Sequence, residues 1–201
     1  MAAGPFLSRL RKIWLLDVPL GPAGAAVLAS AASLGRLQDL MLAQNRLGDE
    51  GGIALARGRF TSLRRLFARD NGLGAEAARA LSEASFTEGL EELEIPGNDI
   101  GDGGARAIAA APALAGLKKL SLGGNHIGDE GALALAGSPH LAGLRELVLS
   151  NNSIGERAQA ALRERFGSRV RTVKLTGSED DDRQRMLAGA DHEHREQGGD
   201  R

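Results

Sequence analysis

The chain has 201 residues, of which 42% are hydrophobic and 25% are charged, and its formal net charge is −1. This length is sufficient for one domain with its own core, and the balanced charge gives no reason to expect nucleic acid or an anionic membrane as a partner. No apolar run approaches the roughly 20 residues of a membrane-spanning helix. The absence of cysteine excludes disulfides and thiolate metal sites, and we expect a cytoplasmic protein.

Residues 1–9 are expected to be a short lead-in, and a regular repeat begins at Leu10. The same aliphatic spacing recurs every 27 residues, with one interval of 26, in five further copies that begin at Leu37, Leu63, Leu90, Leu117 and Leu144. The ninth position of the first copy is Val18, and in the later copies it is an asparagine, at Asn45, Asn71, Asn98, Asn125 and Asn152. Six copies of one pattern predict a stack of similar units, each completed by its neighbours.

Each copy contains the signals of a strand, a turn and a helix. Aliphatic residues at positions four and six predict a short strand with one face in the core. The asparagines are expected to bond backbone groups at the turn and to form a ladder through the stack. An acidic residue then follows a glycine, and we expect it to begin the helix and to cap it, at Asp49, Asp102, Asp129 and Glu156. A bulky anchor precedes the next strand, at Leu34, Phe60, Phe86, Leu114, Leu141 and Phe166.

The repeat domain is assigned to residues 10–178. Its last strand has no turn after it and is expected to place Val170, Val173 and Leu175 at the first, fourth and sixth positions, which makes about seven strands. Residues 179–201 form an acidic tail that begins with Glu179–Asp182. We expect a short capping helix over the last strand and, beyond about Gly189, disorder.

The copies resemble the leucine-rich-repeat pattern L-x-x-L-x-L-x-x-N-x-L over roughly residues 10–175. The long period and the alanine-rich second half resemble the ribonuclease-inhibitor subtype, and the segment 128–136 looks like a group of bacterial leucine-rich-repeat proteins. The resemblance implies an α/β fold, a right-handed solenoid that forms an open horseshoe arc. A parallel sheet of about seven strands then lines the concave side, with helices on the convex side.

No group of residues in the sequence has the composition of a catalytic site. His126 follows a ladder asparagine at a position that varies between copies, and His140 lies in a loop between a helix and a strand. His192 and His194 lie in the tail without a third well-placed ligand. We therefore predict no catalytic residue, no metal and no cofactor.

The concave face offers two columns of side chains. The third positions alternate in charge, which favours pairing between neighbouring strands, and read Lys12, Asp39, Arg65, Glu92, Lys119, Glu146 and Thr172. The fifth positions read Trp14, Met41, Phe67, Glu94, Ser121, Val148 and Lys174. Large exposed apolar side chains commonly mark interfaces. The candidate protein-binding surface is therefore the apolar patch Trp14, Leu16, Met41 and Phe67, edged by Arg65 and Arg69; the alternative is an end that a missing neighbour once covered.

A non-enzymatic scaffold for protein–protein interaction is the function that these features favour, with another protein of unknown identity as partner. One alternative is a regulator of a small GTPase, because Ran-GTPase-activating proteins share the repeat subtype and an acidic tail; this rests on fold-level analogy. Another is a fragment of a larger multidomain leucine-rich-repeat protein. The sequence does not indicate the oligomeric state.

Overall fold

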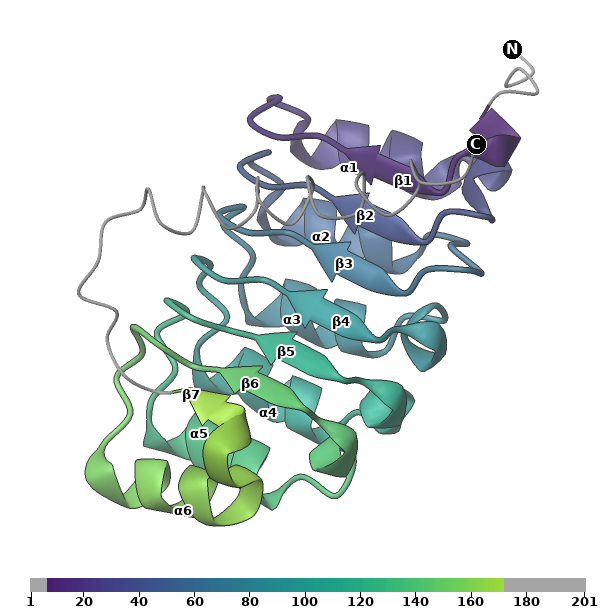
Figure 1. The fold of residues 1–201 in the computed structure, drawn as a ribbon. Coiled ribbons are helices and arrows are strands. Elements are labelled where there is room, and N and C mark those ends of the chain that lie inside the picture. Colours follow the sequence, from purple (N-terminus) through teal and green to yellow (C-terminus); the bar gives the residue numbers. More distant parts are fainter. Residues whose placement is uncertain (1–6, 172–201) are drawn as a thin grey trace, which may run out of the picture.

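The computed structural model describes residues 7–171 (Figure 1). Seven short strands lie side by side in chain order, and every neighbouring pair is parallel. The strands are β1 (Lys12–Trp14), β2 (Asp39–Met41), β3 (Arg65–Phe67), β4 (Glu92–Glu94), β5 (Lys119–Ser121), β6 (Glu146–Val148) and β7 (Val170–Arg171).

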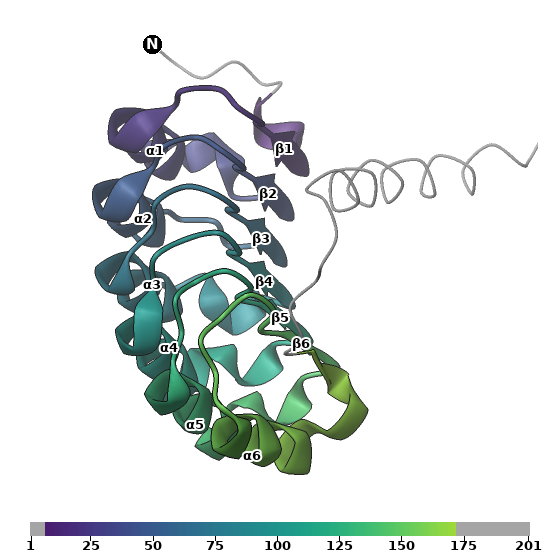
Figure 2. The same cartoon turned by 90° about the vertical axis from the view of Figure 1, so that its left-hand side faces the viewer.

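One helix follows each of the first six strands. The helices are α1 (Gly21–Ser30), α2 (Gly48–Ala56), α3 (Ala75–Ser82), α4 (Gly101–Ala110), α5 (Asp129–Gly137) and α6 (Glu156–Phe166). A short 3₁₀ turn precedes every strand of this range except β3, including one at Leu7–Arg9 and one at Gly167–Arg169. The helices lie on the outer side of a curved stack and the strands on its inner side (Figure 2). The predicted open α/β arc is confirmed.

The strands pair in the register that the repeat predicts. The fourth positions of the first six units lie opposite one another, from Ile13 beside Leu40 to Leu120 beside Leu147. These leucines are almost fully buried between sheet and helices. Because side chains alternate along a strand, the third and fifth positions face the opposite, inner side of the arc. The sheet therefore carries those two columns on its concave face.

Small residues bring the helix of one unit against the helix of the next. A methyl group at Gly52 of α2 would lie 2.5 Å from the Cβ of Ala77 in α3. A methyl group at Gly104 of α4 would lie 2.9 Å from the Cβ of Ala78. Alanine and glycine in these helices thus set the spacing of the outer layer, as dense packing requires.

The asparagine ladder is present. Asn98 accepts hydrogen bonds at Oδ1 from the backbone N–H groups of Asn71 and Leu73, at 2.9 and 3.0 Å, and its Nδ2 donates to the carbonyls of Ala68 and Ile95. Asn125 and Asn152 make corresponding bonds. The side-chain amides therefore satisfy backbone groups where strand pairing stops.

Asn45 is the exception at the start of this ladder. It is fully buried, and its Oδ1 atom has no hydrogen-bond partner within residues 7–171. In the preceding unit the N–H of Leu20 bonds the carbonyl of Val18 instead of reaching Asn45. The first unit, which has Val18 in place of an asparagine, thus leaves one buried acceptor unsatisfied.

The acidic residues begin the helices within one residue of the predicted place, but the expectation that each caps its own helix is wrong. Asp49 in α2 accepts hydrogen bonds from the backbone N–H groups of Gly74 and Ala77, at the start of α3. Asp102 in α4 does the same for Gly128 and Gly131. The carboxylate lies one unit away from the N–H groups it caps, because the start of each helix sits beside the start of the next. Capping here joins neighbouring units.

We expect Asp102→Ala to lower the free energy of unfolding by about 1 to 2 kcal/mol, because two N–H groups at the start of α5 lose a charged acceptor. The control is Glu130→Ala, which removes an exposed ion pair with Arg106 and should cost less than about 0.5 kcal/mol. Urea unfolding monitored by circular dichroism measures both. Equal losses in the two variants would contradict the bridging role of Asp102.

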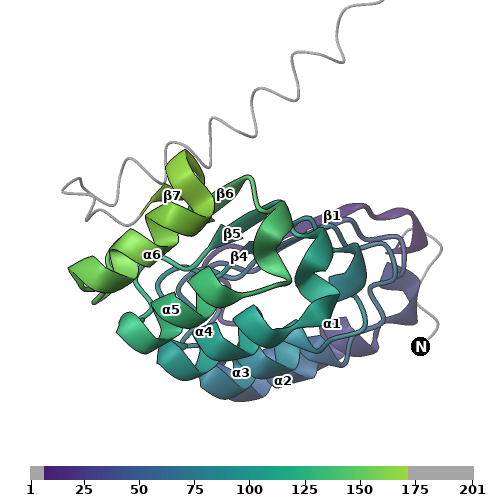
Figure 3. The ribbon, with the colours of Figure 1, turned by 90° about the horizontal axis from the view of Figure 1, so that it is seen from below.

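The last strand exists, but its predicted register is wrong. Val170 lies opposite Leu147 and Arg171 opposite Val148, so Val170 occupies the fourth position instead of the first. The physical reason is the path after α6: the helix continues to Phe166, Gly167 turns the chain at φ 60°, and a single 3₁₀ turn leads directly into β7. β7 and α6 close one end of the stack (Figure 3). Residues 172–201, including Val173, Leu175 and the predicted tail helix, lie outside the described residues.

Candidate functional site: the concave face over the first three strands

The first three strands bring the predicted apolar side chains together. Trp14 lies opposite Met41, and Met41 lies opposite Phe67, in the parallel register of β1, β2 and β3. Trp14 and Leu16 are each 51% exposed, whereas Met41 and Phe67 are half-buried. The four side chains come from one end of the sheet and form the apolar patch.

The first unit exposes more apolar surface than the sequence indicated. Residues 7–171 contain five exposed large hydrophobic side chains, and four of them belong to this unit: Trp14, Leu16, Val18 and Val27. Val27 lies on α1, a helix without a charged residue. The uninterrupted apolar composition of Gly21–Ser30 was the signal that could have revealed this second exposed area. It lies on the helix side, away from the sheet face that carries Trp14.

Paired charges border the patch. The buried carboxylate of Asp39 accepts hydrogen bonds from Arg65 Nε and Nη2, at 2.6 and 2.9 Å, and lies 3.6 Å from Lys12 Nζ. Arg69 Nε donates to Asp70 at 2.8 Å. The predicted pairing along the third positions is therefore present over β1–β3, where two cations share one buried carboxylate.

Charge pairs continue beyond β3. Lys119 lies 2.6 Å from Glu94, at a fifth position, and 3.9 Å from Glu146, at the next third position. Burial raises the pKa of Glu92, and the charges of Arg65 and Lys119 only partly oppose this effect. Because the pKa is raised, the carboxylate of Glu92 is held less firmly in its charged form than an exposed glutamate.

The two halves of the concave face differ in charge. In the three strands β1–β3, two basic side chains accompany one acidic side chain. In the three strands β4–β6, three acidic side chains accompany one basic side chain. The apolar patch therefore lies in the basic half, and the far half is acidic and lacks large exposed apolar groups on the sheet.

The two histidines within residues 7–171 are at least partly exposed to solvent. His126 is exposed and its Nε2 lies 3.3 Å from Asp99, and His140 is partly exposed in a connection before β6. Within residues 7–171 no three histidine or acidic side chains are grouped as metal ligands. His192 and His194 lie outside the described residues. Helices in this same range are all too short or too polar to cross a membrane.

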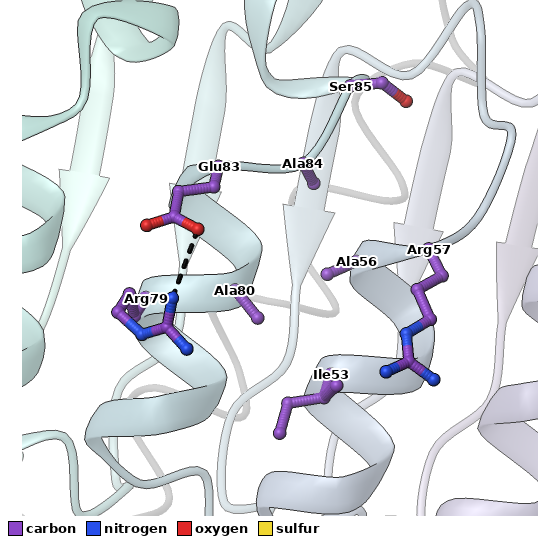
Figure 4. Close-up of a pocket in the computed structure, with 8 residues that line it drawn as sticks. All are labelled: Ile53, Ala56, Arg57, Arg79, Ala80, Glu83, Ala84 and Ser85. Atoms are coloured by element: carbon purple, nitrogen blue, oxygen red, sulfur yellow. Dashed lines mark hydrogen bonds and ion pairs between the residues drawn. The ribbon is translucent and has the colours of Figure 1, made fainter.

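A shallow groove of about 400 Å³ lies on the helix side of the molecule, between α2 and α3 (Figure 4). Its lining includes Ile53, Arg57, Arg79 and Glu83. Arg79 points toward Glu83 and pairs with it at 3.3 Å. Its pKa is raised, first by the hydrogen bond and charge of Glu76 and then by the charge of Glu83. Two of the groove's polar side chains, Arg79 and Glu83, are therefore paired with each other.

Repeats, strand register and asparagine ladder together define a leucine-rich-repeat solenoid. A family model described as "Leucine Rich repeat" matches residues 37–56, 90–109 and 117–136. The sequence-based prediction of leucine-rich repeats is confirmed.

One solved structure shows the same fold at low identity. The chain is similar to a chain of the yeast Rad7 and Elc1 complex, with 18% identity and a TM-score of 0.53 over 77% of this chain and 41% of that chain. An internalin from Listeria monocytogenes is 18% identical over 75% of this chain and 58% of that chain, with a TM-score of 0.32. This chain therefore spans less than two thirds of either structure. No curated protein sequence matches it.

Proposed function

We propose that the chain is a non-enzymatic scaffold that binds another protein through the apolar patch. The observation that carries this proposal is the continuous column of Trp14, Met41 and Phe67 across three paired strands, with Arg65 and Arg69 at its edge. Leucine-rich repeats commonly serve as protein-interaction scaffolds, and solenoids present extended concave surfaces for this purpose.

The chemistry of the patch supports a protein partner. Tryptophan and arginine are enriched among the residues that dominate binding energy at protein interfaces. The apolar surface lies on an open sheet, which offers a large contact area instead of the enclosed cavity that a small molecule requires. Carboxylates lie among the cations at its border, as in the Asp39 cluster, and this arrangement does not favour the uniform charge of a phosphate backbone.

Three finer assignments belong to the same proposal. The 27-residue period and the alanine-rich helices support the ribonuclease-inhibitor-like subtype, and the segment 128–136 supports the resemblance to bacterial repeat proteins. The absence of cysteine supports a cytoplasmic location. Regulation of a small GTPase, the sequence-based alternative, gains no support from the described residues, and the scaffold remains the function that we propose.

A comparison of captured proteins tests the proposal. We expect the variant Trp14→Ala/Phe67→Ala to lose its specific partner by about 30-fold or more in affinity, because each truncation removes about 1 to 2 kcal/mol or more from an interface centre. The control is Val148→Ala/Leu133→Ala, which shortens apolar side chains at the far end of the same column and on α5.

Both variants must keep the circular dichroism spectrum of the wild type. Partner profiles that are the same for the wild type and the Trp14→Ala/Phe67→Ala variant would show that the patch is an uncovered end of the stack and not a binding surface.

A further inference from the structure

The basic half of the concave face continues beyond the strands themselves. Residues at the second, third and seventh positions of the first three units add further cations, so that the surface around the patch carries Arg11, Lys12, Arg64, Arg65 and Arg69. The acidic residues at the corresponding positions and in the adjoining turns are Asp17, Asp39 and Asp70, and Glu91 of the next unit pairs with Arg64. A surface with five basic and four acidic side chains and an apolar centre fits an acidic segment that also carries apolar residues.

The chain itself contains a segment of this composition. Glu179–Asp182 is a run of four acidic residues, and Met186 and Leu187 follow after Arg183, Gln184 and Arg185. The other half of the concave face is acidic at Glu92, Glu94 and Glu146 and would repel such a run. The outer face of α6 is basic near Arg163 and Arg165 but offers no exposed large apolar side chain.

The length of chain after β7 is sufficient for this segment to reach the patch. Asp182 is eleven residues beyond Arg171, and eleven extended residues span up to about 36 Å. β3 is four strands away from β7 and β1 is six strands away, which corresponds to about 19 and 29 Å at the usual strand spacing. The path along the inner side of a curved sheet is shorter still.

We propose that Glu179–Asp182 docks in cis on the apolar patch and its basic border, with the carboxylates at Arg65 and Arg69 and the apolar residues that follow at Trp14 and Met41. A guanidinium has five donors and can hold more than one carboxylate, so the pairs that Arg65 and Arg69 make with Asp39 and Asp70 persist. This inference rests on the proposed function, because the docked run competes with the external protein.

Two consequences define the partner and its regulation. An external protein that binds this patch presents a segment of the same kind, acidic and apolar. A tethered competitor acts at an effective concentration near the millimolar range, so the docked run lowers the apparent affinity of that partner. Neutralising the run removes the competition without changing the patch.

Tryptophan fluorescence of the full chain tests the docking. Trp14 is the only tryptophan and the chain has no tyrosine, so the emission reports on the patch alone. We compare wild type with the variant Glu179→Gln/Asp180→Asn/Asp181→Asn/Asp182→Asn. The rate constant for quenching by acrylamide should rise about twofold in the variant, the change expected if docked side chains cover half of the accessible ring, and the emission maximum should shift to longer wavelength.

The matched control removes the same number of charges from the end of the tail, in the variant Asp191→Asn/Glu193→Gln/Glu196→Gln/Asp200→Asn. It should quench like the wild type. In about 1 M NaCl, where the Debye length falls to about 3 Å, the wild type should approach the neutralised variant. Equal quenching of the wild type and both variants overturns the inference, and so does an equal increase in both variants.

Crosslinking distinguishes docking of the acidic run on the patch from docking elsewhere on the surface. The chain has no cysteine, so Asp181→Cys can be combined in turn with Leu16→Cys in the patch, Val148→Cys in β6 or Arg163→Cys in α6. A short thiol-reactive crosslinker should react fastest within the Leu16→Cys pair, although Val148 and Arg163 are closer to the tail along the chain. Faster reaction at Val148 or Arg163 overturns the inference, and so does a product that joins two chains.

Failure of this inference is distinguishable from failure of the proposed function. If the tail does not dock, quenching and crosslinking fail, but loss of the external partner in the Trp14→Ala/Phe67→Ala variant still occurs. If the patch binds no external protein, the captured profiles are unchanged, whatever the position of the tail.

Discussion

Replacing Asn98 with alanine is expected to lower the free energy of unfolding by about 4 kcal/mol. The side chain is 2% exposed and joins its own unit to the preceding one. Its loss leaves the N–H groups of Asn71 and Leu73 buried without an acceptor, and each buried unsatisfied group costs about 1 to 3 kcal/mol. The carbonyls of Ala68 and Ile95 lose their donor as well.

Asn45→Ala is the matched comparison, because Asn45 is equally buried but its Oδ1 accepts no hydrogen bond within the described residues. Only its donation to the carbonyls of Leu15 and Ala43 is lost, so we expect a cost of about 2 kcal/mol or less. Urea unfolding of the two variants measures the difference. A larger loss for Asn45→Ala than for Asn98→Ala would show that the ladder does not stabilise the stack through its acceptor atoms.

Leu120→Ala is expected to cost about 3 to 5 kcal/mol. Leu120 has no exposed surface and lies in β5 between Leu93 and Leu147. Truncation removes buried apolar surface and leaves a cavity that units on both sides can only partly fill. The effect is expected to be large because Leu120 lies between buried leucines of the strands on both sides.

The same substitution at an exposed leucine provides the control. Leu133 lies on α5 and is 39% exposed, and Leu133→Ala should cost less than about 1 kcal/mol. Thermal or urea unfolding measures both variants. Equal destabilisation would contradict the assignment of Leu120 to the centre of the core.

The repeat made most of the fold predictable. Each leucine, asparagine and alanine position recurs, so the strand register of the first six units follows directly from the 27-residue spacing. The last strand was less predictable, because Val170, Val173 and Leu175 imitate the aliphatic spacing of a complete unit. Its register depends on where α6 ends, and the positive φ at Gly167 determines that point.

The capping hydrogen bonds between neighbouring units were also not predictable from the sequence. Asp102 is an acidic residue at the start of a helix, so the sequence predicts that it caps its own helix. Only the stacking of the helices reveals that its carboxylate accepts hydrogen bonds from the N–H groups of Gly128 and Gly131. The neighbours Trp14, Met41 and Phe67 were predictable from their shared position in the repeat. Their unequal exposure was not, because it depends on the place of each strand in the stack.

A photocrosslinking scan along the fifth positions tests the central proposal most directly. A photoreactive amino acid replaces Trp14, Met41, Phe67, Glu94, Ser121 or Val148 in separate full-length variants, and crosslinked proteins are identified after irradiation in a lysate of the source cell. We predict that intermolecular products with one recurrent partner form at positions 14, 41 and 67 and decline toward position 148. Products that are equally frequent along the whole column, or that concentrate at positions 121 and 148, would contradict a binding surface over the first three strands.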